Sequence, residues 1–166
     1  MRSQSLQREV PDPWEALGSP DHVSLFVLRL LGERYAVEAN LVQEVIRIGP
    51  ITRLPAAPAF LLGVFNHRGE ILALMDPAQL LAEENTPLAT GSRAAIVQSG
   101  EWRLAMVAEA LEGLISVPPA ALESPPASGP GPSEFLKYVA NTREGPLAVL
   151  DLARMIDAAR ARSIPG

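Results

Sequence analysis

Few side chains in this 166-residue sequence could do chemistry. There is no cysteine, and the two histidines, His22 and His67, lie far apart in the sequence, so it predicts no transition-metal site. His67 falls in a turn, where we expect a solvated loop residue. The segment 129–131, Gly-Pro-Gly, is a proline loop and not a cradle of free N–H groups for a phosphate. We therefore expect no metal ion and no cofactor.

Asp76 and Asp151 are the most suggestive carboxylates. Each follows an apolar run of strand length and precedes a helical segment, so each is explained as a helix N-cap worth about 1 kcal/mol. No serine or histidine stands in a nucleophile context. The sequence thus favours a protein that is not an enzyme, and a hydrolase that uses Asp76 or Asp151 is the catalytic alternative.

The composition is that of a globular protein, with 48% hydrophobic and 20% charged residues. The formal charge is −5 and the isoelectric point is near 5.1, which argues against a general binder of nucleic-acid phosphates. Aromatic residues make up only 5%, so a platform for stacked bases is not expected. We therefore expect no nucleic-acid partner.

The N-terminal segment is polar and interrupted by prolines, with no apolar stretch long enough for a signal peptide. We expect residues 1–21 to form a flexible arm, in which Trp14 is the only large apolar anchor for the domain or for a partner. No run of about 18 apolar residues occurs, so we expect a cytoplasmic protein without membrane insertion.

The elements that would position these side chains are short. Sixteen prolines and twelve glycines punctuate the chain at close intervals, which favours many short strands. Residues 66–70, Asn-His-Arg-Gly-Glu, have a hairpin-turn signature. A short helix is expected over 78–84, and a C-terminal helix over about 151–162 presents one apolar face.

An internal repeat organises the chain. Residues 60–76 align without a gap on residues 135–151 at an offset of 75, with eight identities in seventeen positions. The identical pairs are Phe60/Phe135, Leu61/Leu136, Val64/Val139, Asn66/Asn141, Arg68/Arg143, Leu72/Leu147, Ala73/Ala148 and Asp76/Asp151. Upstream the offset is 69, which places residues 34–37 over 103–106.

The repeat predicts two small strand-rich units that pack together, because one unit of about 65 residues buries too little apolar surface alone. We expect a mostly β fold of two tandem five-stranded barrels with a shared hydrophobic core and a short helix after each repeat. Residues 22–160 would form a single domain, with one subdomain over about 22–85 and the second over about 90–152.

Two charged residues lack a structural explanation. Arg68 precedes Gly69 in the expected turn, and Glu44 lies among Val42, Val45 and Ile46. They could form a surface salt bridge, which contributes little to stability. They could equally form the charged rim of an apolar groove that binds a protein partner.

Taken together, several motifs of the sequence resemble those of the CheW family, the coupling proteins of bacterial chemotaxis. The matching motifs are Tyr35-Ala36-Val37, Val42-Gln43-Glu44-Val45, Ile51-Thr52-Arg53-Leu54-Pro55, Gly63-Val64, Asn66-His67-Arg68-Gly69-Glu70 and Asp76. Their order and spacing are specific together, although each alone is weak. The resemblance covers roughly residues 22–158.

The resemblance implies SH3-like barrels and a protein without enzymatic activity. It implies an adaptor that joins the regulatory domain of a CheA-type histidine kinase to the cytoplasmic tips of methyl-accepting chemoreceptors, and that reaches membrane receptor arrays through these partners. The receptor's helical hairpin would lie in a groove between the two subdomains. The implied partner-binding residues are Val42, Glu44, Gly63, Asn66, Arg68 and Gly69.

The chain departs from the family pattern at Ala73, at Glu109, and at Tyr138, the repeat mate of Gly63. The second subdomain is therefore the more divergent one. Such departures are expected of a paralogue that serves a non-flagellar chemosensory pathway. Another alternative is a β-barrel module that senses a small ligand in an internal pocket.

Overall fold

The computed structural model describes residues 21–126 and 133–163. The expected flexible arm over residues 1–21 lies outside this range, except for its last residue. The strands are β1 (Val23–Leu30), β2 (Glu33–Glu38), β3 (Val42–Arg47), β4 (Leu61–His67), β5 (Glu70–Met75), β6 (Arg93–Ser99), β7 (Trp102–Val107), β8 (Ala110–Val117), β9 (Leu122–Glu123), β10 (Leu136–Thr142) and β11 (Gly145–Leu150). The helices are α3 (Pro77–Ala82) and α4 (Leu152–Ser163), with 3-10 turns η1 (Ala39–Leu41), η2 (Pro119–Ala121) and η3 (Ser133–Phe135).

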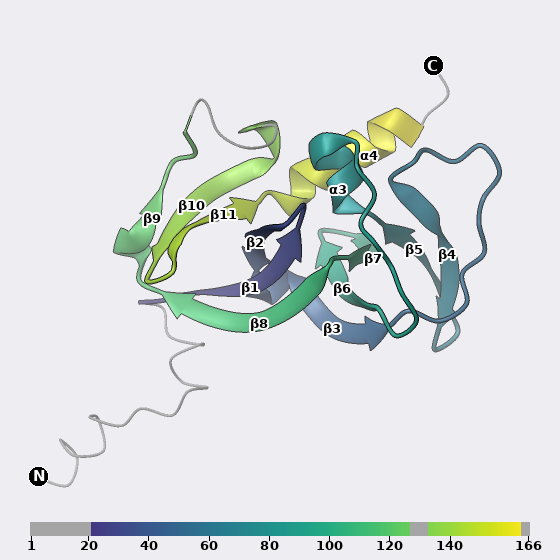
Figure 1. The fold of residues 1–166 in the computed structure, drawn as a ribbon, viewed down its shortest axis with the longest axis horizontal. Helices are drawn as coiled ribbons and strands as arrows, with labels where there is room; N and C mark the ends of the chain where they lie inside the picture. The colour runs from purple at the N-terminus through teal and green to yellow at the C-terminus, as the bar shows by residue number, and fades with distance from the viewer. Residues whose placement is uncertain (1–20, 127–132, 164–166) are drawn as a thin grey trace, which may run out of the picture.

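The strands form two sheets, and Figure 1 shows them on either side of the two helices. Sheet A has the order β8-β1-β2-β11-β10-β9, and sheet B has the order β3-β6-β7-β5-β4. All neighbours are antiparallel except β11–β2 and β5–β7. The expected mostly β fold with few helices is confirmed.

The two repeats exchange strands, which corrects the expected tandem arrangement. Sheet A takes β1 and β2 from the first repeat and β8 to β11 from the second, while sheet B takes β3 to β5 from the first and β6 and β7 from the second. Equivalent strands meet at equivalent residues: Leu74 pairs with Ala105 in sheet B, and their repeat mates Val149 and Ala36 pair in sheet A. The two sheets therefore do not coincide with residues 22–85 and 90–152.

Each sheet curls around its own apolar cluster. The buried residues of the sheet B cluster are Leu72, Leu74, Ala94, Ile96, Ala105 and Val107, and Ile46 and Leu62 from the two edge strands pack against them. A larger cluster joins the two sheets and both helices, and includes Leu28, Val97, Leu81 and Met155. In the strand pairing of the described residues neither sheet closes on itself, so the closed SH3-like barrel stays a prediction.

The two repeated aspartates cap the two helices. Asp76 is 1% exposed, and its carboxylate accepts hydrogen bonds from the Ala78 N–H, the Thr86 N–H and the Thr86 hydroxyl at 2.6–3.0 Å. Asp151 accepts from the Arg154 N–H at 3.1 Å. The N-cap interpretation is confirmed. Within the described residues, no helix is long and apolar enough to cross a membrane.

Candidate partner-binding site

An ion-paired cluster joins the two edge strands of sheet B. Arg68 Nη2 donates to Glu44 Oε1 at 2.8 Å, and Nη1 lies 3.4 Å from Glu44 Oε2. His67 Nε2 lies 3.2 Å from the same Oε2 atom. Glu44 belongs to β3 and His67 to β4, which are the opposite edges of the sheet. The sheet therefore curls far enough for side chains, rather than backbone groups, to link its edges.

The turn between β4 and β5 presents the arginine of this cluster. Arg68 and Gly69 have φ angles of 51° and 85°, the left-handed pair that a two-residue hairpin turn requires. The Gly69 N–H donates to Asn66 Oδ1 at 2.9 Å, which ties the turn to its own strand. The Arg68 side chain is 75% exposed, while that of Glu44 is 27% exposed. A fixed turn thus holds an accessible guanidinium over a half-buried carboxylate.

His67 differs from its expected role as a solvated loop residue. It is the last residue of β4, and its side chain is only 14% exposed. The ring lies edge-on to Phe65, with centroids 6.5 Å apart, and contacts Glu44 through Nε2. The expectation is wrong because the curl of the sheet brings β3 over the end of β4.

The other predicted site residues divide into two groups. Val42 lies on β3 two residues from Glu44, half-buried against the shared core. Gly63 is buried, with a φ of 155°, and a Cβ atom there would lie 2.5 Å from the Thr52 carbonyl oxygen. The structure thus gathers Glu44, Asn66, Arg68 and Gly69 at one end of sheet B, whereas Gly63 has a structural explanation of its own.

Arg103 binds residues that neighbour the cluster in sequence, and sequence reasoning missed it. Its Nε donates to Gln43 Oε1 at 2.6 Å, and its Nη1 lies 2.7 Å from Glu70 Oε2. The repeat mate Arg34 does the same in sheet A, where it pairs with Glu112 and Glu144. The signal that could have revealed this role is the alignment of residues 34–37 on 103–106, which brings two arginines into register.

The three departures from the family pattern all fit locally. The carboxylate of Glu109 accepts the Gly32 N–H at 2.7 Å. The Tyr138 hydroxyl donates to Glu38 Oε2 at 3.3 Å, and burial, followed by the charge of Glu38, raises its pKa above the usual value near 10. Ala73 lies in β5, half-buried. Sheet A therefore accepts a tyrosine where sheet B requires Gly63.

A family model described as a CheW-like domain matches residues 24–160, nearly the whole of the described region. The chain belongs to the CheW-like family. As a member of this family, it is a chemosensory adaptor and not an enzyme. The resemblance seen in the sequence is thereby confirmed.

Similar proteins agree with this assignment. The chain is 29% identical to Protein FrzA of Myxococcus xanthus over 156 residues. This alignment covers 93% of the chain and 98% of FrzA. It is 23% identical over 141 residues to the chemotaxis protein CheW of Treponema pallidum, covering 81% of this chain and 82% of that protein. The fold matches that of the scaffolding protein TtCheW from Thermoanaerobacter tengcongensis, with a TM-score of 0.73 and 24% identity over 82% of this chain and 88% of that one.

The ion-paired cluster on sheet B is suited to binding a protein partner. Among residues 21–126 and 133–163, no three histidine or carboxylate side chains gather as metal ligands. The Glu44–Arg68–His67 cluster instead presents both signs of charge in a fixed geometry. Such a surface can fix the register of a bound helix or strand, because charged pairs on a rim reward only one alignment.

Proposed function

We propose that this CheW-like adaptor joins a CheA-type histidine kinase to the cytoplasmic tip of a methyl-accepting chemoreceptor, through a surface that contains the Glu44–Arg68 pair. The observation that supports this most directly is the exposed Arg68 guanidinium held 2.8 Å from Glu44 by a two-residue turn. An exposed salt bridge of this kind adds little to stability, so its fixed placement is better explained by recognition.

The proposed receptor contact is a helix laid across the end of sheet B. An amphipathic helix buries apolar side chains against a groove, and charges at the groove rim set its register. On the Glu44 face of sheet B the partly buried Ile46 and Phe65 provide apolar surface, whereas Val42 and Val45 lie on the opposite face of β3. Asn66 and Gly69 shape the turn that carries Arg68, so they support the contact without having to touch the partner.

The adaptor then acts by assembly. A protein that binds both kinase and receptor raises the effective concentration of one near the other, without any chemical step of its own. It works in the cytoplasm and reaches the membrane only through the receptor. Operation in a non-flagellar pathway and the sensing of a small ligand stay predictions from the sequence.

A pull-down with the tagged full chain from its native cytosol and membranes tests the proposal. We expect recovery of a histidine kinase and a methyl-accepting receptor, and a loss of at least one of them with Arg68→Ala or Glu44→Ala. Arg143→Ala is the matched control, because Arg143 is the exposed repeat mate of Arg68 in the other hairpin turn. Recovery of neither protein by a folded chain would contradict the proposal.

A further inference from the structure

The molecule carries the same groove twice. Groove B, about 560 Å³, lies on strands β4, β5 and β7 of sheet B, and groove A, about 370 Å³, lies on β10, β11 and β2 of sheet A. Repeat-mate pairs that line both grooves are Leu61/Leu136, Val64/Val139 and Ala73/Ala148. Because equivalent residues of the two repeats line both grooves, the element that packs beside one groove indicates which kind of element could pack beside the other.

Helix α4 forms one wall of groove B. It begins after β11 of sheet A and crosses to sheet B, where Ile156, Ala159 and Arg160 line the groove. Its buried face includes Ile156 and Ala159. The Arg160 guanidinium stacks over the Trp102 ring, 4.2 Å from the ring centroid. Sheet B thus shows how an amphipathic helix with apolar residues and a basic one packs beside such strand faces.

Groove A lacks this helix. Its expected counterpart is α3, the repeat mate of α4, but α3 has only six residues and ends where Glu83 adopts a left-handed conformation. The positions that match Ala159 and Arg160 are Glu84 and Asn85, beyond the end of α3. Within the part of the chain that the structure describes, no helical residue lines groove A; its outer wall is the segment from Glu123 to Pro126.

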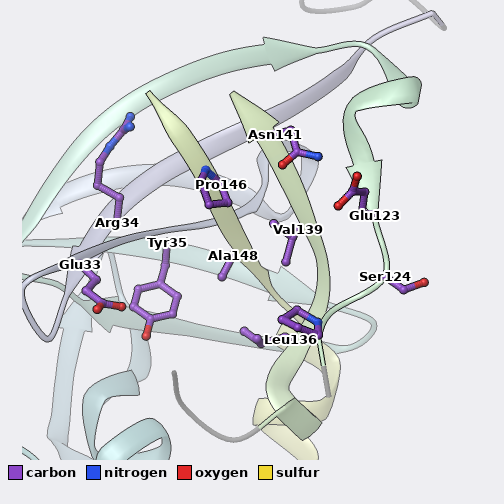
Figure 2. Close-up of a pocket in the computed structure, with 11 residues that line it drawn as sticks. Glu33, Arg34, Tyr35, Glu123, Ser124, Leu136, Val139, Asn141, Pro146 and Ala148 are labelled. Carbon is purple, nitrogen blue, oxygen red and sulfur yellow. The ribbon is translucent and has the colours of Figure 1, made fainter. Parts of the chain in front are cut away.

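The rim of groove A carries two carboxylates, Glu33 and Glu123, while its lining arginine, Arg34, is already paired with Glu112 and Glu144. Glu33 takes the position of Trp102 in the repeat, and Figure 2 shows Glu33 and Glu123 on opposite sides of a space lined by Tyr35, Ala148 and Val139. Both glutamates are exposed, and neither forms an ion pair with another described residue. Burial, and then the charge of Glu33, raises the pKa of Tyr35. A basic side chain in the groove would relieve this excess of negative charge.

We propose that groove A docks an amphipathic helix of a protein partner, with small apolar residues against Val139 and Ala148 and a basic residue between Glu33 and Glu123. The helix would lie on sheet A in the way that α4 lies on sheet B. This surface is separate from the Glu44–Arg68 site and goes beyond the function proposed above. We infer the chemistry of the bound helix from Glu33 and Glu123 at the rim of groove A and from the packing of α4 beside groove B.

The test uses α4 itself as a probe. A fluorescein-labelled peptide of residues 152–163, with three arginines and one aspartate, is titrated against the full chain and followed by fluorescence anisotropy. We expect saturable binding that weakens as salt is added. The double variant Glu33→Lys/Glu123→Lys should weaken binding tenfold or more. The double variant Glu84→Lys/Glu101→Lys makes the same charge change at exposed positions outside the groove and should leave binding unchanged.

Several results would overturn the proposal. The peptide could fail to bind the full chain, which includes the case in which residues 1–20 of the chain already fill the groove. Binding could be lost in the groove B variant Ile71→Asp and kept in the groove A variant, which would place the peptide on groove B. Sedimentation of the free chain could reveal a dimer that Glu33→Lys/Glu123→Lys dissociates, and groove A would then belong to a second copy. Equal melting temperatures of the variants exclude unfolding as a cause.

Discussion

Arg68 affects the free energy of unfolding in two opposite ways: its backbone conformation is unfavourable, and its side chain forms an ion pair. A residue other than glycine in the left-handed region costs roughly 1 kcal/mol, and Arg68 has a φ of 51°. Its exposed pair with Glu44 returns about 0–1 kcal/mol, so stability alone does not explain an arginine at this place in the turn.

Arg68→Gly separates these two effects. Glycine removes the backbone cost and the ion pair together, so the free energy of unfolding should change by no more than about 1 kcal/mol. Partner binding, by contrast, should weaken by more than about 1 kcal/mol. Urea unfolding and a binding titration measure the two. A large loss of stability would assign Arg68 to the fold instead of to recognition.

At the residue scale the sequence singled out Glu44 and Arg68 without deciding what they do. Glu44 and Arg68 stood out because an exposed turn and an apolar strand gave them no structural partner. A salt bridge between them was one of two interpretations that the sequence left open, and the structure contains it. The sequence did not show how they meet, because Glu44 and the end of β4 lie on opposite edges of a sheet whose curl depends on distant strands. The roles of His67 and Arg103 depend on the same curl, so one was misinterpreted and the other was missed.

At the scale of elements, the start of strand β4 is set by one glycine. The pairing of β4 with β5 shifts its register between Leu61 and Gly63, and the bulge brings Gly63 against the loop at Thr52. Thr52 and Val64 then exchange two backbone hydrogen bonds of 2.8 and 2.9 Å. The close approach of the two backbones leaves no room for a side chain.

Gly63→Ala should therefore destabilise the protein by roughly 2 kcal/mol or more, because the new Cβ atom would overlap the Thr52 carbonyl oxygen. Gly100→Ala is a matched control. Gly100 has a φ of 61°, but a Cβ atom added there would meet nothing within 4 Å, so only the backbone cost of about 1 kcal/mol is expected. Thermal unfolding of both variants compares them; equal costs would show that the clash with Thr52 is relieved by a small shift.

Local sequence signals predicted the hairpin and the helices better than they predicted the bends and register shifts within strands. The hairpin at 66–70 and both aspartate-capped helices could be found from local signals, since turn and cap residues act on their own neighbours. The local pattern of residues 40–46 is compatible with a turn of helix and with a bent strand, and the structure has η1 followed by β3. The register shifts within strands depend on contacts across the sheet, which a local pattern does not contain.

At the scale of the whole molecule, the exchange of strands makes each half of the chain depend on the other. Sheet B has no centre without β6 and β7, and sheet A loses β1 and β2 if the first repeat is removed. The repeat in the sequence predicted two similar strand-rich units, and the structure has two similar sheets, each built from strands of both repeats. It could not show the exchange, because an alignment of two segments does not say which strands share a sheet.

Fragments 1–88 and 89–166 test this dependence. We expect each fragment alone to lack a cooperative unfolding transition, because its strands miss their central partners. An equimolar mixture should recover the circular dichroism of the intact chain. Cooperative folding of either fragment by itself would show that a half-chain can close its own sheet.

Co-sedimentation tests the central claim, that this chain joins kinase to receptor through the Glu44–Arg68 surface, most directly. The purified chain is mixed with the regulatory domain of a CheA-type kinase, with a soluble receptor fragment, and with both. We expect a complex of all three, loss of one contact with Glu44→Arg, and partial recovery when Arg68→Glu is added to restore the pair with reversed charges. A chain that binds neither protein, or a complex that is indifferent to both substitutions, would contradict it.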